Sequence, residues 1–442
     1  MELSSTAVFV LMLVSLIIGI FSGYYVFVVL GGLGVLFGLL FWGPEVFNLA
    51  FTVTLGTLRN YSLLAIPLFV FMGHMLDRSG IAKKLFDILA LSLGGLKGGL
   101  AVASLFISIL FAACTGIIGA SVVTMGLLFL PAMLARGYNK QMASGVVCAG
   151  GTLGILIPPS IMLIVYGPAA GLSVGRLFYA AMGPGILMGV LYVVYVLVRC
   201  QINPALGPAV PIEERNALST WEKTKGLLIN MVPVLALILA VLGVIWFGIA
   251  PPTEAAAVGA LVSMIIAAAH GKLNFKVIKE TVHSTLLTTS MILMIVVCAG
   301  IFVGVFTRLG GGRVVQNILL GLPFDKWGVF LFMMLIVFVL GFLMDWVASL
   351  LIIVPLFTPI AATLGFDPLW FAAMVCVMYQ TSFLTPPFAY SIFYLKGIAP
   401  PEISSPDIMK GVIPFVIIQF VTLFLCIVFP QIIMWLPQQM IR

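Results

Sequence analysis

Apolar runs long enough to cross a membrane recur along the chain, and they constrain its fold more than any other feature. A helix needs about 20 apolar residues to span a hydrocarbon core of roughly 30 Å. Of the 442 residues, 62% are hydrophobic and 8% are charged, a balance that soluble globular domains do not have. Because lipid offers the backbone no hydrogen-bond partners, the runs should be helices. The sequence therefore predicts an all-α polytopic membrane protein.

The boundaries of the apolar runs predict where the spans lie. The expected spans are 5–22, 24–42, 61–77, 142–170 (broken), 183–198, 227–247, 254–270, 284–306, 369–396 (broken) and 411–436. Residues 44–57 and 272–283 are predicted to be interfacial amphipathic helices or, equally well, solvated loops. The first run follows Glu2 and no basic segment or cleavage site, which favours a first span over a signal peptide.

Two further apolar segments, 99–134 and 327–362, are interrupted halfway, by Cys114-Thr115-Gly116 and by Met344-Asp345-Trp346. Each half has about 15 residues, or roughly 22 Å of helix, which is shorter than the hydrocarbon core. A re-entrant helical hairpin fits each segment better than two spans. The tip of such a hairpin must lie in protein or face water, because lipid would leave its backbone unpaired.

Two of the expected spans contain a stretch that cannot continue as regular helix. The first is Gly150–Ser160, which includes Pro158-Pro159, and the second is Gln380–Pro387, which ends in Pro386-Pro387. Proline removes a backbone donor and pushes the residue before it out of the helical region. Broken helices in corresponding halves of a membrane protein are typical of a transporter binding site.

The two halves of the chain repeat with an offset of 228 residues. The offset superposes Ala120-Ser121 on Ala348-Ser349, Pro131 on Pro359, and Pro158-Pro159 on Pro386-Pro387. Five spans separate equivalent points, which predicts halves of opposite orientation, the inverted repeat of secondary transporters. The expected divisions are 1–95 (first-half scaffold spans), 96–198 (first-half hairpin and broken helix), 199–226 (cytoplasmic linker), 227–283 (second-half scaffold spans) and 284–442 (second-half hairpin and broken helix).

The distribution of Lys and Arg predicts the orientation. With the N-terminus outside, most of the 21 basic residues fall on one side, which is then cytoplasmic. The first hairpin should enter from the cytoplasm and the second from outside. Because the basic residues are scattered, nucleic acid is not an expected partner. The six cysteines show no paired or metal-type spacing and are expected to be small buried side chains.

The two breaks carry oxygen ligands of the kind that small cations prefer. Around the first break we expect a site made by Ser121, Gly150, Gly151 and Thr152. Around the second we expect one made by Asp345, Ser349, Thr381, Ser382 and Thr385, with Gln380 in the same run. Sodium is the expected ion. The alternative is a pair of packing kinks in which the hydroxyls bond carbonyls of their own helix.

Few charged side chains lie inside the apolar segments. Asp345 should be paired, protonated or bound to a cation, because an isolated charge costs about 2.5–3.5 kcal/mol at the membrane centre. Arg308 could receive a substrate carboxylate as a planar fork, or it could snorkel to the interface. Glu254 is expected to be a first-turn acid of a helix. No P-loop, metalloprotease motif or nucleophile elbow is present, so the sequence does not predict an enzyme.

Taken together, several stretches resemble the large membrane subunit of TRAP (tripartite ATP-independent periplasmic) transporters. These stretches are Leu64–Phe69, Ser79–Ala82, Gly154–Ser160, Pro252–Ala260 and Thr385–Pro387. The resemblance implies an elevator-type, sodium-coupled importer of a small organic acid in the bacterial inner membrane. It also implies two partners, a small four-helix membrane subunit and a periplasmic binding protein that delivers the solute.

The same resemblance implies roles for individual residues. The first sodium site would be Ser121 with Gly150–Thr152, and the second would use Asp345 and the hydroxyls of the second break. Arg308 resembles the arginine that receives the substrate carboxylate, with Ser121, Thr385 and Asp345 also near the solute. The first hairpin tip, Thr115–Ser121, departs from the Ser-Gly-Ser-Ser-like pattern of many members and has fewer hydroxyls. The run Gln380–Phe388 resembles the branch that handles 2-oxo acids or lactate.

Three other functions fit parts of the pattern. The nearest is a sodium/carboxylate symporter of similar architecture that needs no binding protein. A channel would give passive flux without saturation. An intramembrane enzyme would need a catalytic partner for Asp345, and the sequence offers no second intramembrane aspartate for it.

Overall fold

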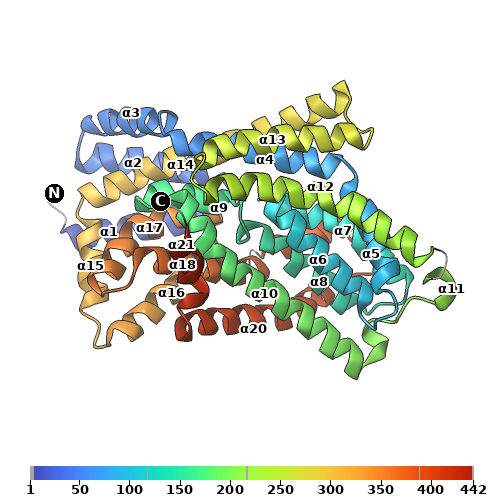
Figure 1. Cartoon of the computed structure of the whole chain (residues 1–442). Helices are drawn as coiled ribbons and strands as arrows, with labels where there is room; N and C mark the ends of the chain where they lie inside the picture. The colour runs from blue at the N-terminus through green and yellow to red at the C-terminus, as the bar shows by residue number, and fades with distance from the viewer. Residues whose placement is uncertain (1–3, 117, 216–217, 388, 441–442) are drawn as a thin grey trace.

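A computed structural model describes residues 4–116, 118–215, 218–387 and 389–440, with the backbone alone at 112–115. The described residues form helices and no strands (Figure 1). The helices are α1 (Ser5–Phe21), α2 (Val26–Phe41), α3 (Glu45–Leu58), η1 (Tyr61–Leu64), α4 (Ala65–Arg78), α5 (Ile81–Leu93), α6 (Gly99–Thr115), α7 (Ile118–Ala135), α8 (Lys140–Thr152), η2 (Leu153–Ile155), α9 (Ile161–Ala170), α10 (Val174–Ile202), η3 (Pro204–Leu206), α11 (Ile212–Arg215), α12 (Thr220–Trp246), α13 (Pro252–Ala269), α14 (Phe275–Arg308), α15 (Gly311–Leu320), α16 (Lys326–Leu343), α17 (Trp346–Thr363), α18 (Pro368–Leu384), α19 (Tyr390–Ile398), α20 (Ser405–Val428) and α21 (Gln431–Gln439).

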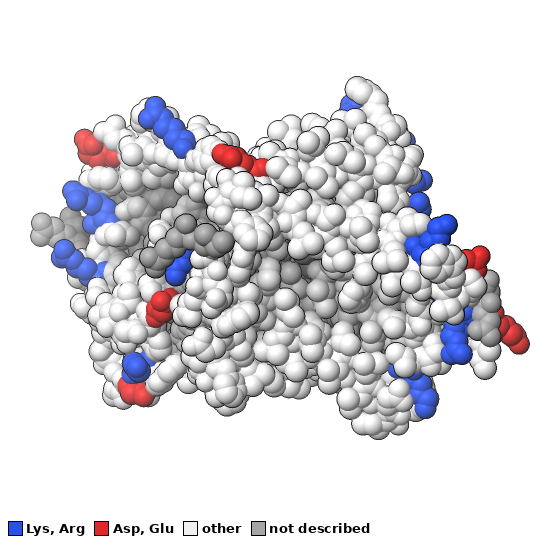
Figure 2. Space-filling model, in the orientation of Figure 1, with Lys and Arg blue, Asp and Glu red and all other residues white. Residues whose placement is uncertain are grey.

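The helices confirm a polytopic membrane protein. By length and composition, 8 helices of the described chain could cross a membrane, or up to 9 if the bent pair α3 and α4 counts as one span. Figure 2 shows charged residues gathered at the two ends of the molecule, with a broad band of uncharged residues between them. This is the surface that a protein crossing a hydrocarbon layer should present, because exposed charges are costly within it.

Some predicted boundaries were wrong. Residues 275–283 are the first turns of α14, a single helix of 34 residues, and do not form a separate interfacial segment or a loop. At about 1.5 Å per residue α14 is roughly 51 Å long, so its polar start extends beyond the hydrocarbon core. Residues 45–58 are helical and pack against α2 and α14. The last predicted span ends at Val428, and α21 follows it as a short separate helix.

The internal repeat extends to nearly every helix. Adding 228 to the bounds of α7 (118 and 135) gives those of α17 (346 and 363), and the same offset relates α6 to α16, α8 to α18 and α10 to α20. The exception lies in the scaffold segments. The chain bends by 56° between α3 and the segment formed by η1 and α4, whereas the equivalent residues belong to the uninterrupted α14.

Both predicted hairpins are pairs of helices. The first is formed by α6 and α7 and the second by α16 and α17, and Figure 1 shows the two pairs at opposite ends of the molecule. The arms α7, α16 and α17 have 18 residues each, longer than the sequence indicated, so length alone does not separate a re-entrant arm from a span. At the first tip, Ile117 and the side chains of Cys114 and Thr115 lie outside the described residues.

Both predicted breaks are present, the first at 153–160 and the second after α18 ends at Leu384. The peptide bonds Pro158-Pro159 and Pro386-Pro387 are cis. Before each break, the helix packs on the hairpin of its own half, α8 on α7 and α18 on α16. After each break, the helix packs on the hairpin of the other half, α9 on α17 and α19 on α7. The two halves are therefore interlocked at the centre of the protein.

Candidate functional site

The tips of both hairpins line one cavity of about 80 Å³, which we call the tip cavity. Its walls also include the helices that follow the two breaks and the middle of α14. The lining residues are Gly116, Ile118, Gly119, Ile161, Thr288, Met291, Ile292, Asp345, Trp346, Val347, Tyr390 and Tyr394. Elements of both halves therefore line a single cavity. This agrees with the packing of α9 and α19, each of which lies against the hairpin of the opposite half.

Two glycines allow the first hairpin tip to approach its neighbours. Gly116 ends α6 with a positive φ of 60°, a backbone conformation that other residues rarely adopt. A Cβ on Gly119 would lie 3.0 Å from Cζ of Tyr394, so the ring of Tyr394 covers this turn of α7. Tyr394 and Tyr390 lie one turn apart on α19, and both line the cavity with Asp345. They join the two hairpin tips.

Among the described residues that line the tip cavity, Asp345 has the one charged side chain. It is the N-cap of α17, where its Oδ1 accepts a hydrogen bond of 2.9 Å from the backbone N–H of Val347. A carboxylate at this position is stabilised by the unpaired N–H groups of the first helical turn. The cap fixes Asp345 at the tip, where it can attract a cation without a basic residue beside it.

The other predicted ligands of the second break are not among the described residues that line the tip cavity, and their hydroxyls are bonded elsewhere. Oγ of Ser349 and the hydroxyl of Tyr379 lie 2.8 Å apart. Thr381 donates to the carbonyl of Met378 (2.6 Å), and Thr385 donates to that of Thr381 (2.7 Å). Ser382 donates to the carbonyl of Phe338 (3.3 Å). These bonds use the hydroxyl protons and leave oxygen lone pairs that can still accept or bind a cation.

Gln380 stands apart in this group. Its side chain is fully buried, and neither polar atom of its amide has a hydrogen-bond partner within the described residues. Buried amides are normally paired, so an unpartnered one points to a missing water or ion. The sequence placed Gln380 in the polar run but did not assign it as a ligand.

The first break has less side-chain chemistry. Thr152 donates to the carbonyl of Ala149 (2.9 Å), and Ser121 is buried. A Cβ on Gly151 would lie 3.1 Å from Cα of Val122, which means that α8 and α7 meet backbone to backbone here. A Cβ on Gly150 would lie 2.7 Å from Oγ of Ser108, a buried hydroxyl that the sequence did not single out.

Arg308 is not brought to the tip cavity. It ends α14, with its guanidinium carbon 5.3 Å from the centroid of the Trp42 ring. Thr288 lines the cavity on the same helix 20 residues earlier, a separation of about 30 Å along a straight helix. In this structure, then, Arg308 does not reach a solute bound beside Asp345.

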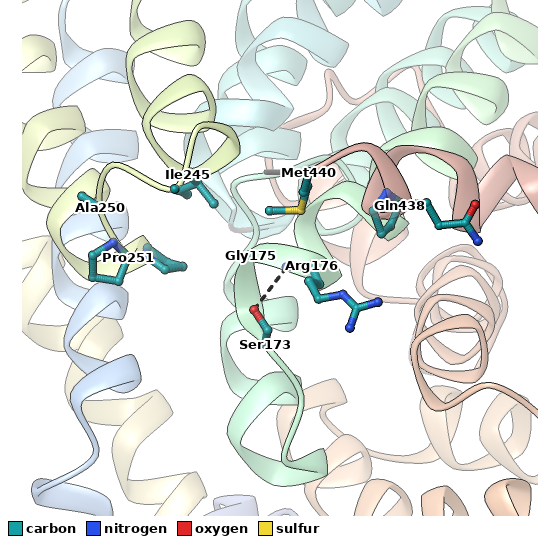
Figure 3. Close-up of a pocket in the computed structure, with 11 residues that line it drawn as sticks. Ser173, Gly175, Arg176, Ile245, Ala250, Pro251, Gln438 and Met440 are labelled. Atoms are coloured by element: carbon teal, nitrogen blue, oxygen red, sulfur yellow. Dashed lines mark hydrogen bonds between the residues drawn. The ribbon is translucent and has the colours of Figure 1, made fainter. Parts of the chain in front are cut away.

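A cavity larger than the tip cavity lies away from the hairpins. It has a volume of about 540 Å³ between the start of α10, the turn from α12 to α13, and α21 (Figure 3). Among the described residues, Arg176 is the one charged side chain that lines it, and Oγ of Ser173 accepts a hydrogen bond from the backbone N–H of Arg176. None of its lining residues belongs to a hairpin or to a break, so volume alone does not identify the site.

The donors at the centre restrict which ion could bind. Within the described residues, no three His, Cys, Asp or Glu side chains come together as a metal site. The available groups are hydroxyls, carbonyls and the carboxylate of Asp345. Such oxygen donors suit hard cations and do not suit zinc or other metals that prefer nitrogen and sulfur.

Comparison with known proteins identifies the family. The sequence profile described as "Tripartite ATP-independent periplasmic transporter, DctM component" matches residues 6–432. The chain belongs to this family. It is therefore a multi-pass permease of the bacterial inner membrane and not an enzyme.

Individual DctM relatives differ in the solute that their names state. The chain is 32% identical over 400 residues to the C4-dicarboxylate TRAP transporter large permease protein DctM of Vibrio cholerae, with 86% of each chain covered. It is 30% identical to the isethionate TRAP transporter permease protein DctMQ of Oleidesulfovibrio alaskensis, covering 88% of this chain and 59% of that one. These comparable identities do not single out a solute branch, so the 2-oxo acid or lactate branch stays a prediction.

A solved structure supports the fold of this DctM protein. The YdaH transporter of Alcanivorax borkumensis superposes with a TM-score of 0.62 at 15% identity, covering 88% of this chain and 89% of that one. At this identity the likeness concerns the fold alone.

Proposed function

We propose that this permease imports a small carboxylate by sodium-coupled secondary transport. The observation that carries the proposal is the tip cavity, where Asp345 lies between two hairpin tips and two broken helices. A carboxylate at a hairpin tip attracts sodium, and bound sodium then offsets its negative charge. An anionic solute can enter only after that neutralisation, because two nearby negative charges repel each other strongly in a medium of low polarity. Import is thereby coupled to sodium.

The proposed sodium ligands follow the two breaks. The second site would use Asp345 and the oxygens of Ser349, Thr381, Ser382 and Thr385, with the unpartnered amide of Gln380 as a further candidate. The first would use Ser121, Gly150, Gly151 and Thr152, and it would rely mainly on backbone carbonyls. The carbonyl ends of α8 and α18 point toward the breaks, and helix C-termini favour cations.

We propose that the hairpins are re-entrant and move together. The helices α9 and α19 each pack on the hairpin of the opposite half. Both hairpins and both broken helices would therefore move as one unit. This unit would comprise residues 96–198 together with the hairpin and broken helix of 284–442. The remaining scaffold spans, 1–95 and 227–283 with the start of α14, would stay fixed, and 199–226 would link the halves at the cytoplasmic side. An elevator motion along α14 would expose the cavity to each side in turn.

Two partners complete the proposal. A periplasmic binding protein would deliver the solute, and a small membrane subunit would join the permease. The DctMQ relative is longer than this chain, which leaves room in it for a second membrane component. Arg308 would meet the solute carboxylate at the outer end of α14, before the solute reaches the cavity.

Uptake by proteoliposomes that hold the permease and the small subunit tests the proposal. With the binding protein added, labelled 2-oxo acids, lactate and C4-dicarboxylates should accumulate only under an inward sodium gradient. Accumulation without any sodium gradient would refute the coupling. Uptake without the binding protein would support a sodium/carboxylate symporter that needs no binding protein, and flux that does not saturate would support a channel.

A further inference from the structure

Five hydroxyl side chains lie on one face of α14, between its polar start and the tip cavity. They are Thr281, Ser284, Thr285, Thr288 and Thr289, and we call them the hydroxyl face. Their spacing of i, i+3, i+4, i+7 and i+8 is that of a single helix face. From the cavity onward the inward positions change to apolar residues, among them Ile292, which lines the cavity, and Ile295, Ala299, Phe302 and Phe306. One helix therefore has a polar half and an apolar half on its inner side.

The buried members of the hydroxyl face have no hydrogen-bond partners. Thr281, Thr285 and Thr289 are 0%, 9% and 8% exposed, and the Oγ1 atom of each is unpartnered within the described residues. A threonine inside a membrane helix commonly donates to the carbonyl four residues before it, yet these three do not. Buried polar atoms without partners are rare, so three in register point to water or a polar ligand between them.

The hydroxyl face connects two polar regions. At its upper end Thr288 lines the tip cavity. At its lower end Oγ of Ser284 accepts a hydrogen bond of 2.9 Å from Arg78 of α4, whose guanidinium also lies 3.9 Å from Glu280. Arg78 is only partly exposed. A chain of hydroxyls therefore leads from the cavity to a guanidinium near the start of α14.

The helix that packs beside the hydroxyl face is polar at the same level. On α4, which packs on α14, Nε2 of His74 is buried and unpartnered within the described residues. Its neighbour Asp77 accepts a hydrogen bond of 2.8 Å from Thr124 on α7, the inner arm of the first hairpin. The helix α4 therefore contacts the hydroxyl face through Arg78 and the first hairpin through Asp77.

We propose that the hydroxyl face is the route by which the carboxylate leaves the tip cavity for the cytoplasm. The proposal rests on the proposed import function. Hydroxyl groups can donate to a carboxylate in succession, and Arg78 at the far end favours an anion by charge. From Ile292 to Phe306 the inward positions of α14 are apolar and offer no such donors. Between the cavity and the outer end at Arg308, the helix therefore has no comparable row of hydroxyls.

Accessibility of substituted cysteines tests the route directly. Thr281→Cys, Thr285→Cys and Thr289→Cys are made separately in a chain whose six native cysteines are replaced, and inside-out vesicles receive a charged, membrane-impermeant thiol reagent. All three should react from the cytoplasmic side during turnover. Leu286→Cys, on the exposed side of the same helix, is the matched control and should not react. Unreactive Thr285→Cys and Thr289→Cys in a transporting protein would overturn the route.

Isosteric substitution tests whether the hydroxyls matter for release. The pair Thr285→Val and Thr289→Val should slow turnover about tenfold, the effect of losing roughly one net hydrogen bond in the limiting step, and leave the KM for delivered solute unchanged. Thr285→Ser with Thr289→Ser should restore turnover. The control Ser290→Ala changes an exposed hydroxyl of the same helix and should have no effect. Unchanged turnover in the valine pair would refute the route, while persistent sodium-dependent uptake would leave the proposed function intact.

Discussion

The two breaks occupy equivalent places in the repeat but are held by different chemistry. In the first half Gly151 brings the backbone of α8 against the backbone of Val122. The equivalent residue in the second half is Tyr379, whose hydroxyl lies 2.8 Å from Ser349, the repeat counterpart of Ser121. At the first break, the lack of a side chain on Gly151 lets two helix backbones touch. At the second, a hydrogen bond between the side chains of Tyr379 and Ser349 joins the helices. A repeated backbone therefore does not impose a repeated ligand set.

The difference extends to charge. Asp345 stands at the second tip, and the offset of 228 places Ile117 at the equivalent position of the first. The second half can thus bind a cation through a carboxylate, whereas the first has mainly carbonyl and hydroxyl oxygens. We expect the second site to bind sodium more tightly, and the following substitutions test that ranking.

The largest effect is expected from Asp345→Asn. Asparagine caps a helix about as well as aspartate, so the protein should fold, but the charged ligand is lost. The sodium concentration for half-maximal uptake should rise about tenfold or more, since a charge-assisted contact contributes about 1.5–3 kcal/mol. The control is Asp325→Asn, which changes the N-cap of α16, where Asp325 accepts from Gly328. Equal sodium dependence in the two variants would remove Asp345 from the site.

Gly151→Ala should have the next largest effect. The added methyl would lie 3.1 Å from Cα and 3.2 Å from the backbone nitrogen of Val122, atoms that cannot rotate away. Overpacking of this kind costs about 1–3 kcal/mol, visible as a lower unfolding temperature of the purified protein. Gly243→Ala is the control, because its Cβ would meet nothing within 4 Å. If both variants unfold at the same temperature, the close contact of α8 with α7 does not stabilise the first site.

Tyr379→Phe should have a smaller effect. It removes the bond to Ser349 and should lower stability by about 0.5–1.5 kcal/mol, with a severalfold weaker dependence of stability on sodium. Tyr166→Phe is the matched control, since the buried hydroxyl of Tyr166 has no hydrogen-bond partner within the described chain. Thermal unfolding with and without sodium measures both. A greater loss in Tyr166→Phe would contradict the assignment of the Tyr379–Ser349 contact.

Arg308→Gln should have the smallest effect on the sodium dependence of uptake. Because Arg308 lies far along α14 from Thr288, sodium dependence should not change. If Arg308 meets the solute at the outer end of its path, the apparent KM should rise severalfold, as expected for loss of an interaction made before the limiting step. Arg313→Gln serves as a control at the same end. An unchanged KM would leave packing on Trp42 as the role of Arg308.

The sequence predicted the hairpins and breaks because their causes are local. Proline and glycine interrupt a helix wherever they stand, so Pro158-Pro159 and Pro386-Pro387 mark the breaks without knowledge of tertiary structure. The offset of 228 is also a property of the sequence alone. These features sufficed to predict the helical hairpins and the two breaks.

The composition of the cavity could not be predicted in the same way. Tyr390, Tyr394 and Thr288 line it because α19 crosses to the first hairpin and α14 passes both tips, and no local pattern reports such crossings. Arg308 looked suitable by chemistry alone, but the length of α14 separates it from the cavity. The polar residues at 272–283 suggested a separate segment, because the sequence does not reveal that a helix extends beyond the membrane.

The crossing of α9 and α19 also has a consequence for how the protein is made. Tyr394, which covers Gly119 at the first hairpin, is synthesised on the order of tens of seconds after it, at about 5–20 residues per second. The first hairpin must therefore wait in the membrane, incomplete, until almost the whole chain has been translated. Insertion of the first half and completion of its hairpin tip are thus separate events in time, because the tip acquires its contact with Tyr394 only after α19 has been synthesised.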